Sequence, residues 1–288
     1  MAINGKSIYT PKGAALEYGR IGCNFYTGCP HNCEYCYLKR GIIGKALGGT
    51  EVKLKTTLKD ETTAFAIFEH EVARHIDECR KHGIFFSFTC DPLIMQTRYL
   101  TLRAIDHCAV NGIPTRILTK DATFIKDVDW MDALCEEFTP EQKANTHFGF
   151  TLTGRDDMEP GASTNAERIQ AMKVMHDAGF KTWASIEPVV DWVHSGMVIS
   201  DSIDFCDHYK IGLRSGVKKD YYNPSQVYER TRTLVDFITK MGSTVYLKQS
   251  VRTFIGNMYT VTINQFDDLV AKTVDMDGEP FIKRKEAQ

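Results

Sequence analysis

TGCPHNCEYCY, residues 27–37, carries three cysteines at the spacing C-x3-C-x2-C: Cys29, Cys33 and Cys36. Glycine and proline at its start predict a tight loop, and a tight loop can turn three thiolates toward one point. Thiolates are ligands that both iron–sulfur clusters and zinc prefer. Three cysteines leave one iron of a four-iron cluster without a protein ligand, so an external ligand can bind there.

A zinc site is the simpler alternative. Cys23 lies six residues before Cys29 and offers a fourth thiolate, which would close a zinc knuckle of four cysteines. Zinc sites more often pair two C-x2-C halves across a longer spacer, and no second C-x2-C half occurs in this sequence. The cluster is therefore favoured and Cys23 is expected to be a strand residue. A non-catalytic, zinc-stabilised binding module stays open as an alternative.

Composition is that of an ordinary globular protein: 288 residues, 43% hydrophobic and 25% charged. No apolar run approaches membrane-spanning length and the N-terminus lacks the apolar region of a signal peptide. Nine scattered cysteines do not look like a disulfide framework. We therefore expect a cytoplasmic protein without a membrane partner.

The net charge of −2 makes no global case for nucleic-acid binding. Residues 209–252, however, hold nine Lys/Arg against three Asp/Glu. Such a run is either a solvated face or a phosphate-binding surface.

Helical periodicity alternates with short apolar runs of strand type along the chain. Helices are expected over 62–82, 98–111, 127–138, 165–178 and 225–241, with strands over 19–24, 84–88, 116–119, 147–152, 181–186, 208–212 and 244–247. Thr164 and Glu167 have the spacing of a capping box. The glycine-rich segment 41–49 is expected to be a loop, because glycine disfavours helix.

Strands that alternate with helices at this spacing predict parallel βα units. Six or seven strands are too few for a closed eight-fold barrel, so the predicted fold is α/β, an open, partial parallel barrel of (β/α)6 type. The barrel is expected over residues 19–256. It would follow an extended lead-in over 1–18 and precede an appended element over 257–288.

Polar side chains follow most of the predicted strands where each strand ends. The active site of a parallel barrel is built at the C-terminal ends of its strands. We therefore expect one polar rim there, made by the cysteine loop together with Cys90, Asp91, Lys120, Thr151, Glu187 and Lys248.

The cysteine loop, with Tyr35 directly before Cys36, resembles the signature of radical S-adenosylmethionine (SAM) enzymes. The resemblance implies that the three cysteines hold a [4Fe-4S] cluster whose open iron is chelated by the amino and carboxylate groups of SAM. It implies that the reduced cluster cleaves SAM to a 5′-deoxyadenosyl radical, which abstracts hydrogen from a substrate. An electron donor of flavodoxin or ferredoxin type is the implied partner.

Several strand-end residues suit the groups of SAM. Lys120 suits the carboxylate, Glu187 the ribose hydroxyls or the amine, and Thr151 the ribose. Tyr35 offers a contact to adenine. With Asp91 and Lys248, these residues make up the expected cofactor-binding set.

Further segments resemble spore photoproduct lyases and the broader DNA repair photolyase group. Residues 33–38 are similar to that group's cluster loop, 118–120 to its V-T-K strand end, 148–151 to its F-R-F-S strand and 159–163 to its E-P-G-T-S helix opening. A looser likeness, at 185–188 and 247–249, is to phage-associated radical SAM proteins. The implied reaction is hydrogen abstraction from a DNA or nucleotide substrate; the alternative is the same chemistry on a small molecule or a protein.

The return of hydrogen is where the chain departs from the lyases. They carry C-T-S-D at a strand end, and its cysteine returns hydrogen to the repaired thymine; here Phe88 takes that position. Cys90 lies two residues further on, so it presents its thiol on the same face if the strand continues. Cys90 is either a hydrogen donor or an inert buried cysteine. Tyr35 and Tyr37 match lyase tyrosines proposed to relay hydrogen, or they only pack.

Overall fold

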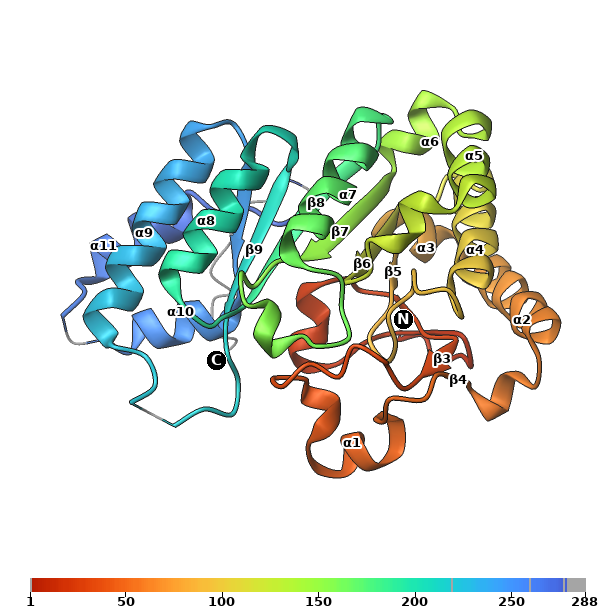
Figure 1. Cartoon of the computed structure of the whole chain (residues 1–288), viewed down its shortest axis with the longest axis horizontal. Helices are drawn as coiled ribbons and strands as arrows, with labels where there is room; N and C mark the ends of the chain where they lie inside the picture. Colours follow the sequence, from red (N-terminus) through yellow and green to blue (C-terminus); the bar gives the residue numbers. More distant parts are fainter. Residues whose placement is uncertain (1, 219, 259, 277, 279–288) are drawn as a thin grey trace. The chain divides into compact units, whose positions relative to one another are not determined.

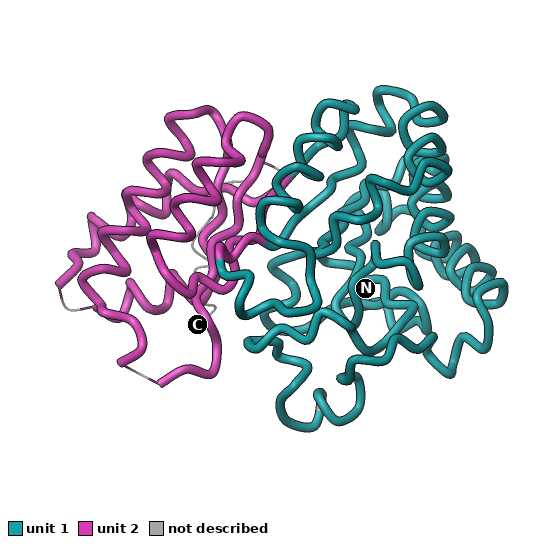
Figure 2. The backbone as a smooth tube through the Cα atoms, viewed as in Figure 1, with its two compact units in different colours: residues 1–151, 155–182 teal, residues 152–154, 183–288 magenta. Residues whose placement is uncertain are grey.

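The structure is a computed structural model that describes residues 2–218, 220–258, 260–276 and 278. The chain separates into two compact units, residues 1–151 with 155–182 and residues 152–154 with 183–288 (Figure 2). Strands alternate with helices in each unit, as the sequence predicts (Figure 1). The boundaries predicted at residues 18 and 256 stay a prediction, and the end of the predicted appended element, 279–288, lies outside the described residues.

A mostly parallel sheet forms the centre of the first unit. Its strands pair in the order β1 (Ile8–Tyr9), β2 (Gly22–Cys23), β5 (Ile84–Phe86), β6 (Thr115–Thr119) and β7 (Thr146–Thr151). Only β1 is antiparallel to its neighbour. Phe86, Ile117 and Phe148 lie opposite one another in register and are buried, so the strands carry the core of this unit.

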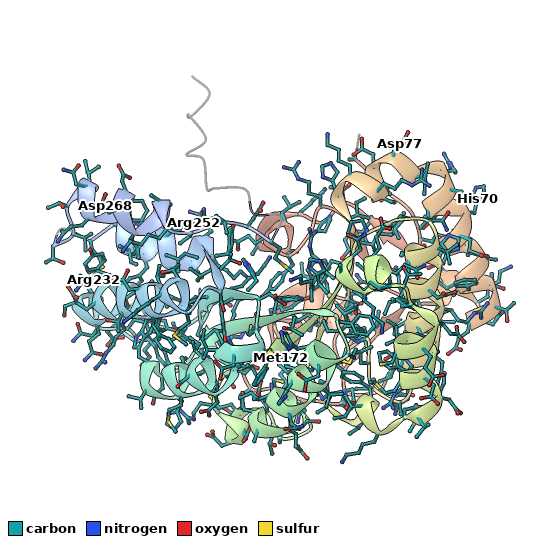
Figure 3. All side chains as sticks on the ribbon, turned by 90° about the horizontal axis from the view of Figure 1, so that it is seen from above. His70, Asp77, Met172, Arg232, Arg252 and Asp268 are labelled. Atoms are coloured by element: carbon teal, nitrogen blue, oxygen red, sulfur yellow. The ribbon has the colours of Figure 1, made fainter. Side chains whose placement is uncertain are left out.

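Amphipathic helices cover this sheet. They are α2 (Glu61–Arg74), α3 (Ile76–His82), α4 (Arg98–Val110), α5 (Val128–Glu137), α6 (Pro140–Ala144) and α7 (Asn165–Asp177). Phe68 and Val72 are buried, whereas His70 and Asp77 are exposed (Figure 3). The single helix predicted over 62–82 is broken at His75, whose backbone leaves the helical region. The capping box of Thr164 and Glu167 is confirmed at the start of α7.

The segment 41–49 also differs from the sequence-based expectation. Residues 41–49 were expected to form a loop because of their glycines, yet Gly41–Leu47 forms helix α1. A Cβ on Gly44 would lie 2.7 Å from the carbonyl oxygen of Leu38, and one on Gly48 would lie 2.2 Å from it. The glycines therefore allow close packing on the preceding turn, and this tertiary gain outweighs their low helix propensity.

The second unit carries three parallel strands, β8 (Lys181–Val189, in this unit from residue 183), β9 (His208–Leu213) and β10 (Thr244–Leu247). Its helices are α8 (Trp192–Ser202), α9 (Pro224–Lys240), α10 (Gln249–Gly256) and α11 (Ile263–Ala271). With the four strands β2, β5, β6 and β7, the described residues hold seven parallel strands, within the predicted six or seven. Within the described part of the chain, every helix is too short or too polar to cross a membrane.

Candidate active site

The first residues of the cysteine loop, which spans residues 28–37, are anchored by backbone contacts with residues 49–54. The loop leaves β3 (Tyr26–Thr27), and the chain later returns through β4 (Lys53–Leu54), which pairs antiparallel with β3. The Cys29 amide donates to the carbonyl oxygen of Gly49 at 2.8 Å. Gly28 has φ of +78°, and a Cβ there would lie 2.0 Å from the carbonyl oxygen of Glu51, so only glycine fits.

The three loop cysteines are free thiols in a half-buried setting. Cys33 is buried, and Cys29 and Cys36 are partly exposed. Burial raises the pKa of the Cys29 thiol to about 12 and also raises that of Cys33. Cys23 lies on β2 and is fully buried, and burial, with a smaller contribution from Cys108, raises the pKa of its thiol. The expectation that Cys23 is a strand residue is confirmed.

The cysteines of the loop are donors that suit an iron–sulfur cluster. Among the residues that the structure describes, no three His, Cys, Asp or Glu side chains are placed to share one metal ion. In an iron–sulfur cluster each cysteine holds its own iron, so the thiolates do not have to converge on a single point. Three cysteines on one short loop, with the fourth candidate turned into the core, match that requirement.

Residues 158–163 hold the loop from another side. The Gly161 amide donates to the carbonyl oxygen of His31 at 3.0 Å, and the Glu34 amide donates to that of Met158 at 2.9 Å. Ser163 binds the end of β6, because its amide donates to the carbonyl oxygen of Lys120 at 3.1 Å and its Oγ accepts from the Ala122 amide at 2.8 Å. The segment that resembles E-P-G-T-S therefore bridges the cysteine loop and a strand end.

A group of buried charges lies beneath the loop. Glu159 accepts hydrogen bonds from the Tyr35 hydroxyl and from Arg168 Nη2, the latter at 2.5 Å, and the side chains of Glu159 and Arg168 are inaccessible to solvent. Burial alone would raise the pKa of Glu159, but Arg168 and Lys120 outweigh it and lower that pKa. Burial and the Glu159 carboxylate raise the pKa of Tyr35, so its hydroxyl stays protonated.

Lys120, at the end of β6, faces this group and the cysteines. Its Nζ lies 5.6 Å from the centroid of the Tyr35 ring, within the range of a cation–π contact. Burial disfavours its charge, but Cys33 and Glu159 outweigh that effect and raise the pKa of Lys120. A half-buried ammonium group therefore stays charged beside the cysteine loop.

Asp91 is buried, and its carboxylate is held by four protein groups. Its Oδ1 accepts from Thr119 Oγ1 at 2.7 Å and from the Leu93 amide at 2.9 Å. Its Oδ2 accepts from the Lys120 amide at 2.7 Å and lies 2.8 Å from His31 Nε2. Burial would raise the pKa of Asp91, but His31 and these hydrogen bonds lower it. Asp91 thus joins the cysteine loop to the end of β6.

Cys90 lies in the segment after β5; because β5 ends at Phe86, the strand does not continue through Phe88 to Cys90, and the strand alternation that would place them on one face does not apply. Cys90 is buried, and its pKa is raised by burial and by nearby Cys29 and Asp91, so it is a neutral thiol. The Tyr37 hydroxyl donates to the carbonyl oxygen of Phe88, which places Tyr37 against the same segment.

The remaining expected cofactor-binding residues are Thr151, Glu187 and Lys248. Thr151 ends β7; it is buried, and its carbonyl oxygen accepts from Arg168 Nη1 at 2.6 Å. Glu187 and Lys248 belong to the second unit, where they form an ion pair with each other.

Sequence reasoning missed His31, Glu159 and Arg168 as members of this site. Glu159 lies in the segment 159–163 that resembles the DNA repair photolyase group, and His31 lies in the cysteine loop, but neither was expected to be a site residue. The available signal was a histidine midway between two cluster cysteines, together with an Arg one helical turn beyond the Thr164 cap.

Comparisons with known proteins agree with this geometry. The model of the radical SAM superfamily matches residues 23–190. "Uncharacterized protein MJ0683" of Methanocaldococcus jannaschii is 28% identical over 194 residues, which cover 65% of this chain and 67% of that protein. "Uncharacterized protein Rv2578c" of Mycobacterium tuberculosis is 25% identical over 183 residues, which cover 62% of this chain and 52% of that protein. This chain therefore spans about two thirds of the first relative and about half of the second.

A solved structure gives the fold. A mutant of spore photoproduct lyase superposes with a TM-score of 0.60 at 14% identity, covering 83% of this chain and 78% of that one. The predicted fold class, an α/β open partial parallel barrel, is confirmed, and so is the resemblance to spore photoproduct lyase in fold. Because the superfamily model matches more than half of the chain, this protein belongs to the radical SAM superfamily.

Proposed function

We propose that this protein is a radical SAM enzyme that abstracts hydrogen from a DNA or nucleotide substrate. The observation that carries the proposal is the loop of Cys29, Cys33 and Cys36, held beside the charged Lys120 and apart from Cys23. A [4Fe-4S] cluster bound by these cysteines would supply one electron to SAM, yielding methionine and the 5′-deoxyadenosyl radical that takes a hydrogen atom. The superfamily itself implies the cluster and SAM.

The thiols of the loop must lose their protons when iron binds. Burial raises the pKa of Cys29 and Cys33, so the free loop holds neutral thiols and iron binding would release protons. Lys120 lowers the pKa of both cysteines, and its charge therefore favours the thiolate form. The same ammonium group suits the carboxylate of SAM.

The other cofactor contacts are assigned by their chemistry. Tyr35 presents a ring that Lys120 and Glu159 hold in place, and this ring suits adenine. Thr151 suits the ribose as a short side chain at the end of β7. Glu187 and Lys248 suit the polar groups of SAM as the ion pair of the second unit.

Cys90 is the proposed donor of the returning hydrogen. Its raised pKa keeps the hydrogen on sulfur, which a hydrogen-atom donor requires. Tyr37 lies against the segment that carries Cys90 and keeps a protonated hydroxyl, so it is the proposed relay. The Tyr35 hydroxyl donates to Glu159, which makes Tyr35 the weaker relay candidate.

The substrate class is proposed from the fold likeness to spore photoproduct lyase and from the basic segment 209–252. Lys210, Lys248 and Arg252 of that segment are buried, whereas Arg230 on α9 is exposed. Arg232, on the same helix, is also exposed (Figure 3). Because the charges do not all reach one surface, a small molecule or a protein is retained as the second candidate substrate. An electron donor of flavodoxin or ferredoxin type is the proposed partner.

Anaerobic reconstitution followed by SAM and dithionite tests the reaction. We expect iron and sulfide in the protein, and 5′-deoxyadenosine in the product. DNA binding that weakens steeply with salt would support the DNA substrate, whereas binding without salt dependence, or none, would favour the small-molecule alternative. Zinc without iron would refute the radical chemistry altogether.

A further inference from the structure

The carboxylate of Asp91 is a meeting point of three segments that are distant in sequence. Asp91 itself follows β5 and His31 belongs to the cysteine loop. Thr119 is the last residue of β6, and Lys120 directly follows it. Hydrogen bonds of 2.7 to 2.8 Å join the carboxylate to His31 Nε2, to the Thr119 hydroxyl and to the Lys120 amide. Any displacement of Asp91 therefore moves the cysteine loop relative to the end of β6.

His31 is fixed on the other side of this contact. Its Nδ1 lies 2.9 Å from the carbonyl oxygen of Gly161, and its own carbonyl oxygen accepts from the Gly161 amide at 3.0 Å. Both ring nitrogens thus lie at hydrogen-bonding distance from oxygen atoms, one from the carbonyl oxygen of Gly161 and the other from the carboxylate of Asp91, so the ring is held on both sides. His31 and Asp91 are 4% and 7% exposed, and little water competes for this charge-assisted contact.

The hydrogen bonds of Asp91 leave it no capacity for a cofactor. An ionised carboxylate offers about four acceptor sites. Oδ1 receives the Thr119 hydroxyl and the Leu93 amide, and Oδ2 receives His31 and the Lys120 amide. Asp91 was expected to bind the cofactor, but these contacts favour a different role.

We propose that Asp91 and His31 are positioning residues, which set the spacing between the cysteine loop and Lys120. The inference rests on the proposed function, because the spacing matters only if the cysteines hold the cluster and Lys120 contacts SAM. Asp91 fixes the backbone of Lys120 through its amide, and His31 lies midway between Cys29 and Cys33. The cysteine loop is also anchored by Gly49 and Gly161, so the pair is needed for SAM binding rather than for holding iron.

Asp91→Asn is the first test variant. It removes the negative charge and places an amide where the carboxylate accepted four hydrogen bonds. The matched control is Asp127→Asn, since Asp127 also pairs with a buried cation, Arg98 at 3.1 Å, and caps α5, yet has no contact with the loop. Each protein is reconstituted anaerobically, its iron and sulfide are counted, and SAM binding without reductant is measured by calorimetry.

We expect Asp91→Asn to bind iron like the parent. Its affinity for SAM should fall by about tenfold or more, a factor that corresponds to the free energy of one charge-assisted hydrogen bond. The spectrum of the reduced cluster should also change less on adding SAM than it does in the parent. Asp127→Asn should melt at a lower temperature and bind SAM like the parent. Unchanged SAM binding in Asp91→Asn, or loss of most of its iron, would overturn the proposal.

Two substitutions of His31 test the positioning role if Asp91→Asn does not fold. The amide nitrogen of glutamine lies near the position of Nε2, and that of asparagine near Nδ1. His31→Gln therefore keeps the donor toward Asp91, and His31→Asn keeps the donor toward Gly161. We expect SAM affinity within about threefold of the parent in the first and about tenfold weaker in the second; equal affinities would overturn the proposal.

Measurements of iron content and SAM binding on the parent protein distinguish a failure of the positioning role from a failure of the proposed function. If the parent holds iron and binds SAM while all the variants do so equally well, only the positioning role fails. If the parent itself holds no iron or binds no SAM, the proposed function fails and the positioning role falls with it.

Discussion

Gly161→Ala should displace the cysteine loop, because the glycine is in close contact with the backbone of that loop. A Cβ on Gly161 would lie 2.3 Å from the carbonyl oxygen of Pro30 and 2.9 Å from the Cα of His31. Real Cβ contacts are essentially never under 3.0 Å, so the two segments would have to part by about 0.7 Å (3.0 minus 2.3). Both atoms belong to backbone, which has no side-chain rotation to relieve the clash.

The cost follows from the contacts that the displacement would weaken. Two hydrogen bonds join Gly161 and His31, at 3.0 and 2.9 Å, and each is worth about 0.5–1.5 kcal/mol. Overpacking adds about 1–3 kcal/mol. We expect the free energy of unfolding to fall by about 2–4 kcal/mol, and Tm by at least about 4 °C for a protein of this size. Iron loading should fall as well.

Thermal unfolding of the metal-free protein and iron content after reconstitution are the measurements. Gly196→Ala is the control, because a Cβ there meets only Leu234 Cδ2 at 3.9 Å and Gly196 lies within α8. Alanine is the better helix former by about 1 kcal/mol, so this control should melt at the same or a higher temperature and load iron fully. If Gly161→Ala melted and loaded iron like the parent, residues 158–163 would not support the loop as described.

Three further outcomes are expected. Cys33→Ala should abolish iron loading whereas Cys23→Ala keeps it, and iron loss in the Cys23 variant would show that the ligand set is wrong. Burial would raise the pKa of Glu71, but hydrogen bonds from residues 6–8 outweigh burial and lower that pKa. The Glu71 carboxylate therefore stabilises the folded protein fully at a pH above the ordinary glutamate pKa of 4.5, and this stabilisation is lost as the pH falls through the lowered pKa. Glu71→Gln should cost about 1–3 kcal/mol at neutral pH and less in acid, and a cost that did not shrink in acid denaturation would contradict this. Glu187→Gln should destabilise the protein by about 1–3 kcal/mol by leaving its buried lysine partner with a weaker contact; unchanged urea unfolding would mean that the ion pair adds nothing.

Much of the fold was predictable because its signals are local. Helix α4, strand β6 and the cap of α7 follow from periodicity and from the residues at their ends, which act over one or two turns. Helix α1 was not predictable, because its glycines pack against the carbonyl oxygen of Leu38 in a contact that propensity does not describe. The break at His75 was also missed, since the apolar pattern continues through it.

The sequence by itself determined which cysteines are the proposed cluster ligands, since the spacing of Cys29, Cys33 and Cys36 is a local property. Only the tertiary structure decided which carboxylates serve the site. Asp91 and Glu159 are 60 and 124 residues away from the loop side chains that they bind, His31 and Tyr35. Parallel strands bring such distant residues to one edge, and the hydrogen-bonding capacity of each carboxylate depends on partners that no local pattern specifies.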